Sequence, residues 1–199
     1  MNELRFALTD FETNRPYVPK TPELGEIISG AVIVVDAMTL EEISGLSGTW
    51  NMHPRWPENN DPDALAVNGY TPEEWDRRGV VTHEQFLTEF LQIITGTVFF
   101  AQNVVFDRSF INAELARQNM DWTGHYHSYD LASLALPLLW TGRVTKLKLA
   151  SMCEMFKISN DNEHDAYTDV RRMQKVLKRL RQIDNLLPTV SFACAMDSE

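Results

Sequence analysis

The stretch Leu4-Arg5-Phe6-Ala7-Leu8-Thr9-Asp10-Phe11-Glu12-Thr13 joins a short apolar segment to two carboxylates. Leu4 to Thr9 has the length and composition of a β-strand, so Asp10 and Glu12 fall at the strand's end. Residues i and i+2 of a strand point to the same face, which aims both carboxylates together and puts Phe11 on the opposite side. Two like charges side by side are costly unless a cation intervenes. The stretch therefore predicts a strand that ends in a pair of metal ligands; an exposed strand end is the alternative.

The rest of the chain reads as strands followed by an alternation of strand and helix, which argues an α/β domain. The further predicted strands are Ile27–Val35, which is β-branched and buried, Glu41–Leu46 at an edge, Thr97–Ala101 and Tyr126–Tyr129. The predicted helices begin at Thr71 and at Thr82, then cover Phe106–Gln118, Leu131–Leu139, Leu147–Phe156 and Tyr167–Ile183. Pro72 suits a first helical position, Thr82 and Gln85 form a capping box, and Pro137 should bend or end its helix.

Loops and domain limits follow from proline and polar residues. Thr13–Thr21 is expected to be a loop, and Asn51–Pro62 is the longest irregular stretch, a type of segment that is often functional. We expect a single domain over residues 1–187 and a loosely docked tail over 188–199.

The composition excludes some classes of function. The 199 residues are 44% hydrophobic and 23% charged, which is ordinary for a globular protein, and no apolar run approaches a membrane span. The N-terminus has no signal-peptide pattern, so we expect a cytoplasmic protein whose Cys153 and Cys194 are buried thiols. A net charge of −10 argues against non-specific wrapping of duplex DNA. It favours a local site for a strand end, where metal ions bound by carboxylates supply positive charge.

Asp107 is a second candidate ligand. It follows the apolar strand that ends near Ala101, and it opens a helix whose buried side carries Phe110 and Ile111. Aspartate is also favoured in the first turn of any helix, so a capping aspartate is the alternative interpretation.

The segment His164-Asp165-Ala166-Tyr167-Thr168-Asp169 supplies a third group. Residues five apart on an ideal helix are rotated by about 140°, so His164 and Asp169 would not share a helical face. The segment therefore predicts His164 in a loop and Asp169 in the first turns of the helix, with the imidazole facing a fixed carboxylate. The alternative is a lone surface histidine beside a helix cap.

In this order, Asp-x-Glu-Thr, Asn-x-x-Phe-Asp-x-x-Phe and His-x-Ala-x-x-Asp resemble the three motifs of the DEDDh exonucleases. That superfamily contains proofreading exonuclease subunits, ribonuclease T and oligoribonuclease. Gly25–Asp36 and Ala64–Thr71 also resemble its second strand and the segment before its first helix. The resemblance spans roughly residues 4 to 180 and implies a ribonuclease H-like fold, an α/β domain with a mixed five-stranded sheet flanked by helices. The chain departs from the family pattern at Asn14, Arg15, Ser29 and Gln102, which puts substrate preference in doubt more than catalysis.

The resemblance implies a two-metal 3′→5′ exonuclease that releases nucleoside 5′-monophosphates from single-stranded ends. Asp10, Glu12, Asp107 and Asp169 would bind two Mg²⁺ or Mn²⁺ ions, with Asp10 bridging them, and His164 would be the general base. The expected substrate contacts are Phe11, Thr13, Tyr70, Gln102, Asn103 and Phe106. The ring of Phe11 could instead lie in the core.

Several alternatives stay open. Single-stranded DNA is placed slightly ahead of RNA, and an RNA-trimming or oligoribonucleotide exonuclease is the rival enzyme, because no residue decides the sugar. A non-catalytic nucleic-acid- or protein-binding module is the rival from another class. The basic run in Tyr167–Ile183 is either a solvated face or a contact for a phosphate backbone. Membrane association is not expected, and the oligomeric state is open, with a homodimer among the options.

Overall fold

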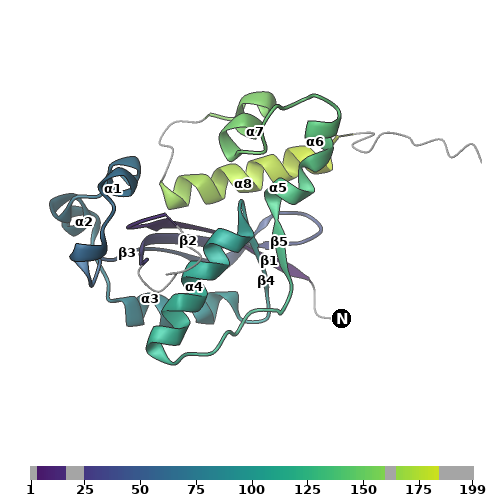
Figure 1. Cartoon of the computed structure of the whole chain (residues 1–199). Coiled ribbons are helices and arrows are strands. Elements are labelled where there is room, and N and C mark those ends of the chain that lie inside the picture. Colours follow the sequence, from purple (N-terminus) through teal and green to yellow (C-terminus); the bar gives the residue numbers. More distant parts are fainter. Residues whose placement is uncertain (1–3, 17–24, 160–164, 184–199) are drawn as a thin grey trace, which may run out of the picture.

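The computed structural model describes residues 4–16, 25–159 and 165–183 (Figure 1). Five strands form one sheet in the order β3-β2-β1-β4-β5. Their bounds are β1 Arg5–Thr13, β2 Ile27–Asp36, β3 Glu42–Asn51, β4 Val98–Ala101 and β5 Ser128–Asp130. β1 and β3 run antiparallel to β2, whereas β4 runs parallel to β1 and β5 parallel to β4. The predicted mixed five-stranded sheet is confirmed.

Helices cover both faces of this sheet (Figure 1). On one face lie α5 Leu131–Leu134, α6 Leu136–Trp140, α7 Leu149–Phe156 and α8 Ala166–Arg181. On the other lie α3 His83–Ile94 and α4 Val104–Gln118. Between β3 and α3 the chain forms the 3-10 turn η2 Pro57–Asn59 and the short helices α1 Pro62–Asn68 and α2 Pro72–Arg78. None of the helices in the described ranges is long and apolar enough to span a membrane.

The alternation of side chains along β1 places the site. Leu8 lies in the core beneath α8, while Ala7 and Phe11 lie in the core against α3 and α4. Successive side chains of a strand point to opposite faces, so Asp10 and Glu12 share the face of Leu8. Both carboxylates therefore face the layer that contains α8.

Most predicted elements exist, with shifted boundaries. β3 continues past the expected Leu46 to Asn51, because backbone pairing with β2 continues as far as Asn51. The helix expected over Leu131–Leu139 is broken into α5 and α6, with Pro137 in the first turn of α6, as predicted. Thr82 caps α3 by accepting the N–H of Gln85 at 3.1 Å, but the Gln85 amide donates to Glu89 and leaves the capping box half made.

The main difference is α1, which the sequence analysis did not predict. It begins where the expected irregular stretch ends, at Pro62, after Asp61 accepts the N–H groups of Asp63 and Ala64. This is an ordinary aspartate cap with proline in the first turn. The expected loop Thr13–Thr21 lies partly outside the described residues, and the expected tail and Cys194 lie wholly outside them. Cys153 is a buried free thiol.

Candidate active site

The end of β1 and the start of α8 bring three carboxylates together. One oxygen each from Asp10, Glu12 and Asp169 lies within 4.8 Å of the others. Asp169 sits in the first turn of α8, whose N-cap Asp165 accepts the backbone N–H and the hydroxyl of Thr168 at 2.9 and 2.8 Å. The cap fixes where α8 begins and thus where Asp169 meets the carboxylates of β1.

Asp107 lies beside this group on the first turn of α4. Its side chain is 3% exposed, and its Oδ1 accepts the backbone N–H of Phe11 at 3.2 Å. The N-cap of α4 is Asn103, so Asp107 is not the cap that the alternative interpretation requires. The bond to Phe11 ties α4 to β1 between the two strand carboxylates.

The buried carboxyl groups of the cluster repel one another, and their pKa values are raised. Burial raises the pKa of Asp10 to about 8, and the charges of Asp169 and Asp165 add to the shift. Burial and the charge of Asp10 raise the pKa of Glu12 to about 9. Burial, together with the charge of Asp10, also raises the pKa of Asp107 well above its usual range. Arg172 on α8 pairs with Asp169 and brings a guanidinium to this acidic cluster.

This donor set fits divalent cations. Carboxylate oxygens are the ligands that Mg²⁺ and Mn²⁺ prefer, and a cation would relieve the repulsion that raises these pKa values. The acidic group can therefore bind metal, as the sequence predicts.

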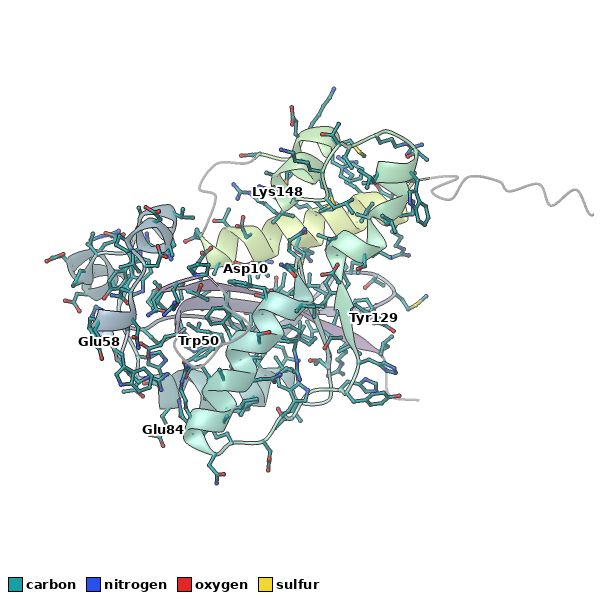
Figure 2. The ribbon with its side chains drawn as sticks, viewed as in Figure 1. Asp10, Trp50, Glu58, Glu84, Tyr129 and Lys148 are labelled. Atoms are coloured by element: carbon teal, nitrogen blue, oxygen red, sulfur yellow. The ribbon has the colours of Figure 1, made fainter. Side chains whose placement is uncertain are left out.

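Asp10, Glu12 and Asp169 line a cavity of about 930 Å³. Its walls come from the end of β1, from α1, from the start of α4 and from the segment that leads into α7. The lining residues outside β1 are Pro16, Asp61, Asp63, Ala64, Val67, Asn68, Gln102, Asn103, Phe106, Ala132, Leu147, Lys148, Leu149, Ala150 and Asp169. Figure 2 shows Asp10 at the sheet beneath α8 and Lys148 at the start of α7. Lys148 is the single lysine or arginine among these described lining residues.

The structure places most of the expected substrate contacts at the cavity. Thr13, Gln102, Asn103 and Phe106 line the cavity. The amide of Gln102 donates to the carbonyl of Leu147 at 2.7 Å, which connects the start of α4 to the opposite wall.

Phe11 also borders the cavity, whereas Tyr70 lies elsewhere. The Phe11 side chain is 3% exposed and its ring packs edge-on against Phe86 and Phe90, as the core alternative describes. Tyr70 does not line the described cavity; its hydroxyl is 3.0 Å from Nδ1 of His53 and its ring contacts Trp75. The expected general base, His164, lies outside the described residues.

A second group of ligand-type side chains is buried away from this cavity. Single atoms of Glu26, His83 and Glu114 lie within 4.8 Å of one another. Arg55 already fills the space between the carboxylates: its Nε donates to Glu26 at 2.8 Å and its Nη2 donates to Glu114 at 2.6 Å. Arg117 donates to Glu114 at 2.6 Å. Two guanidinium groups balance two carboxylates, so this network is a structural ion-pair cluster and not a metal site.

Comparison with known proteins identifies the family. The family model for exonucleases of the ribonuclease T type matches residues 8–177. The chain belongs to this exonuclease family. It is 31% identical to ribonuclease T of Shewanella denitrificans over 135 residues, which cover 62% of this chain and 58% of that protein. It is 25% identical to the PolC-type DNA polymerase III of Thermotoga petrophila over 201 residues, covering 94% of this chain and 13% of that protein.

The fold of this exonuclease family is shared with a larger solved enzyme. Escherichia coli exonuclease I, in a crystal structure with a dT13 oligonucleotide, superposes with a TM-score of 0.76 at 20% identity. The match covers 90% of this chain and 41% of that one. The chain thus spans a little over half of the first of these curated relatives and smaller fractions of the other two proteins. The resemblance to the DEDDh exonuclease superfamily and the ribonuclease H-like fold are confirmed.

Proposed function

We propose that the chain is a metal-dependent 3′→5′ exonuclease that shortens single-stranded nucleic acid and releases nucleoside 5′-monophosphates. The observation that carries the proposal is the cluster of Asp10, Glu12 and Asp169 oxygens within 4.8 Å, with Asp107 beside it. The cluster opens into a cavity of about 930 Å³, within the size range of small-molecule sites and large enough for nucleotides.

Each carboxylate has a role in this proposal. Together the four would hold two Mg²⁺ or Mn²⁺ ions. Bound there, the ions would supply positive charge to a phosphodiester and favour in-line attack by water. Phe11, through its N–H, fixes Asp107, and Arg172 fixes Asp169, so the donor set is oriented before any ion arrives.

The reaction is a hydrolysis. Water adds to the phosphorus, the bond from phosphorus to O3′ breaks, and the shortened strand keeps a 3′-hydroxyl. By family resemblance His164 takes the proton from the attacking water, which suits an imidazole whose reference pKa is about 6.5.

For the substrate, we propose single-stranded DNA with a slight preference over RNA. One relative is by name a ribonuclease, whereas a solved structure of the same fold holds a dT13 oligonucleotide. An RNA-trimming enzyme is therefore the second candidate. The cytoplasmic location, the single domain over 1–187 and the oligomeric state stay predictions.

The test is degradation of matched DNA and RNA oligonucleotides, single- and double-stranded, labelled at the 5′ end. We expect a ladder of shortened labelled strands with Mg²⁺ or Mn²⁺, mononucleotide products by mass spectrometry, and no reaction in EDTA. The Asp10→Asn variant should be inactive with either ion. A wild-type protein that binds the oligonucleotides but never shortens them would instead support the non-catalytic module.

A further inference from the structure

Helix α1 forms one wall of the cavity with little hydrophobic packing to hold it. Asp61 and four residues of α1 line the cavity, namely Asp63, Ala64, Val67 and Asn68. Of the seven described residues of α1, Asn68 alone is buried, and Val67 is 55% exposed. A helix this short is not stable by itself in water. The position of this wall must therefore come from polar contacts to the rest of the molecule.

Those contacts are made at both ends of α1 by two asparagines. At the C-terminal end, Nδ2 of Asn68 donates to the carbonyl of Thr13 at 3.1 Å. At the N-terminal end, Nδ2 of Asn14 donates to Oδ1 of Asn60 at 2.9 Å, and the carbonyl of Asn14 accepts the N–H of Asp61 at 2.9 Å. On the side of β1, these contacts are made by Thr13 and Asn14, the two residues that directly follow Glu12. The wall is thus tied to the strand that carries the carboxylates.

Asn14 is itself held from the other side. Its side chain is fully buried, its Oδ1 accepts the N–H of Glu26 at 2.7 Å, and its own N–H donates to the carbonyl of Glu26 at 3.1 Å. The side chain therefore uses a donor and an acceptor at once, which an amide supplies and neither a carboxylate nor an apolar group can. The Glu26 carboxylate in turn accepts the backbone N–H groups of Arg55 and Trp56, in the segment that leads to α1.

We propose that Asn14 and Asn68 are positioning residues that set the distance of α1 from the carboxylate cluster and so determine how tightly the cavity holds the terminal nucleotides. This inference rests on the proposed function. It assigns the two asparagines to substrate affinity and not to the chemical step, because neither amide donates to a carboxylate of the cluster in the described structure. It also gives a role to Asn14, one of the positions at which the chain departs from the family pattern.

The test compares two substrates that differ in how much of the cavity wall they contact. The p-nitrophenyl ester of thymidine 5′-monophosphate reports on the carboxylate cluster, whereas a short oligothymidylate must also contact the walls. For Asn14→Ala and Asn68→Ala we expect KM for the oligonucleotide to rise about tenfold, the size of one lost hydrogen bond. For Asn14→Ala, at a position that is not among the described residues lining the cavity, we expect kcat for the oligonucleotide and kcat/KM for the ester to stay within about threefold of wild type, which is under 0.7 kcal/mol. Hydrogen exchange at the amides of α1 should quicken in both variants.

Matched variants keep the test decisive. Asn60→Asp retains an acceptor for Asn14 and should behave as wild type, whereas Asn60→Ala should reproduce the KM effect of Asn14→Ala. Asn112→Ala, which removes an exposed amide from α4, is the surface control. If Asn14→Ala fails to fold, the Asn60 pair answers the same question without touching the buried position.

The outcomes separate the two proposals. A wild-type protein that hydrolyses neither substrate with Mg²⁺ or Mn²⁺ refutes the proposed function. A wild-type protein that hydrolyses both, with variants that keep KM or lose both activities equally, refutes the positioning role alone.

Discussion

Replacing Arg55 by methionine should destabilise the protein severely. Arg55 is the shared partner of Glu26 and Glu114, whose side chains are fully buried. The Arg55 side chain is 28% exposed, so the ion pairs lie mostly out of water. Methionine keeps an unbranched, flexible side chain but is shorter, and it removes the charge and all the donors of Arg55.

The magnitude follows from the carboxylate left without its partner. Breaking a buried ion pair by removing one member costs about 3–5 kcal/mol, because the remaining charge stays buried. Glu114 keeps Arg117, whereas Glu26 keeps only neutral backbone and histidine contacts among the described residues. We therefore assign the loss mainly to Glu26. For a chain of this size it corresponds to a drop in Tm of roughly 6–20 °C.

The assay is urea denaturation of the metal-free protein, followed by tryptophan fluorescence. The control is Arg77→Met, which removes an exposed arginine that pairs with Glu74 on the surface and should cost far less. Adding Glu26→Gln to Arg55→Met should restore part of the lost stability, since it removes the uncompensated charge. If Arg55→Met lowers the free energy of unfolding by less than about 1 kcal/mol, or if the double variant recovers no stability, the ion pairs of Arg55 do not stabilise the fold as argued.

Three further outcomes concern the site. His164→Ala should lose most turnover yet bind an oligonucleotide in Ca²⁺ with near wild-type anisotropy, and a wild-type kcat would remove His164 from the base role. Binding of Mn²⁺ at neutral pH should release protons, because Asp10 and Glu12, with pKa values of about 8 and 9, must ionise to coordinate it; calorimetry in buffers of different ionisation enthalpy measures the release, which should fade at higher pH. The folded-state pKa values of both groups lie above their unfolded values of 3.8 and 4.5, so the folded, metal-free protein binds more protons between about pH 5 and pH 8 and its stability should fall as pH rises there. Urea denaturation in EDTA checks this, and an equal slope in Asp10→Asn would contradict it.

Local rules were enough to predict part of the site. The period of a strand pairs Asp10 with Glu12, and the order of loop and helix places Asp169 in the first turn of α8. Asp107 needed tertiary structure, since the sequence cannot distinguish a capping aspartate from one that accepts the N–H of Phe11.

What the sequence did not predict depends on contacts between distant segments. The sequence did not predict the wall formed by α1, because the residues that hold it, Thr13 and Asn14, lie far from it along the chain. The basic run of α8 had two interpretations. Arg171 and Lys178 pair with Glu42 and Glu41, and Arg172 pairs with Asp169, so three of these cations serve the fold or the site.

The separation of the carboxylates along the chain bears on when activity can arise during synthesis. Asp10 and Glu12 emerge from the ribosome before Asp169, which lies on the last described helix. A nascent chain that has been made only as far as α7 lacks both Asp169 and its partner Arg172. On the proposed function such a chain cannot complete its ion-binding set, so the nuclease becomes competent only when α8 has docked.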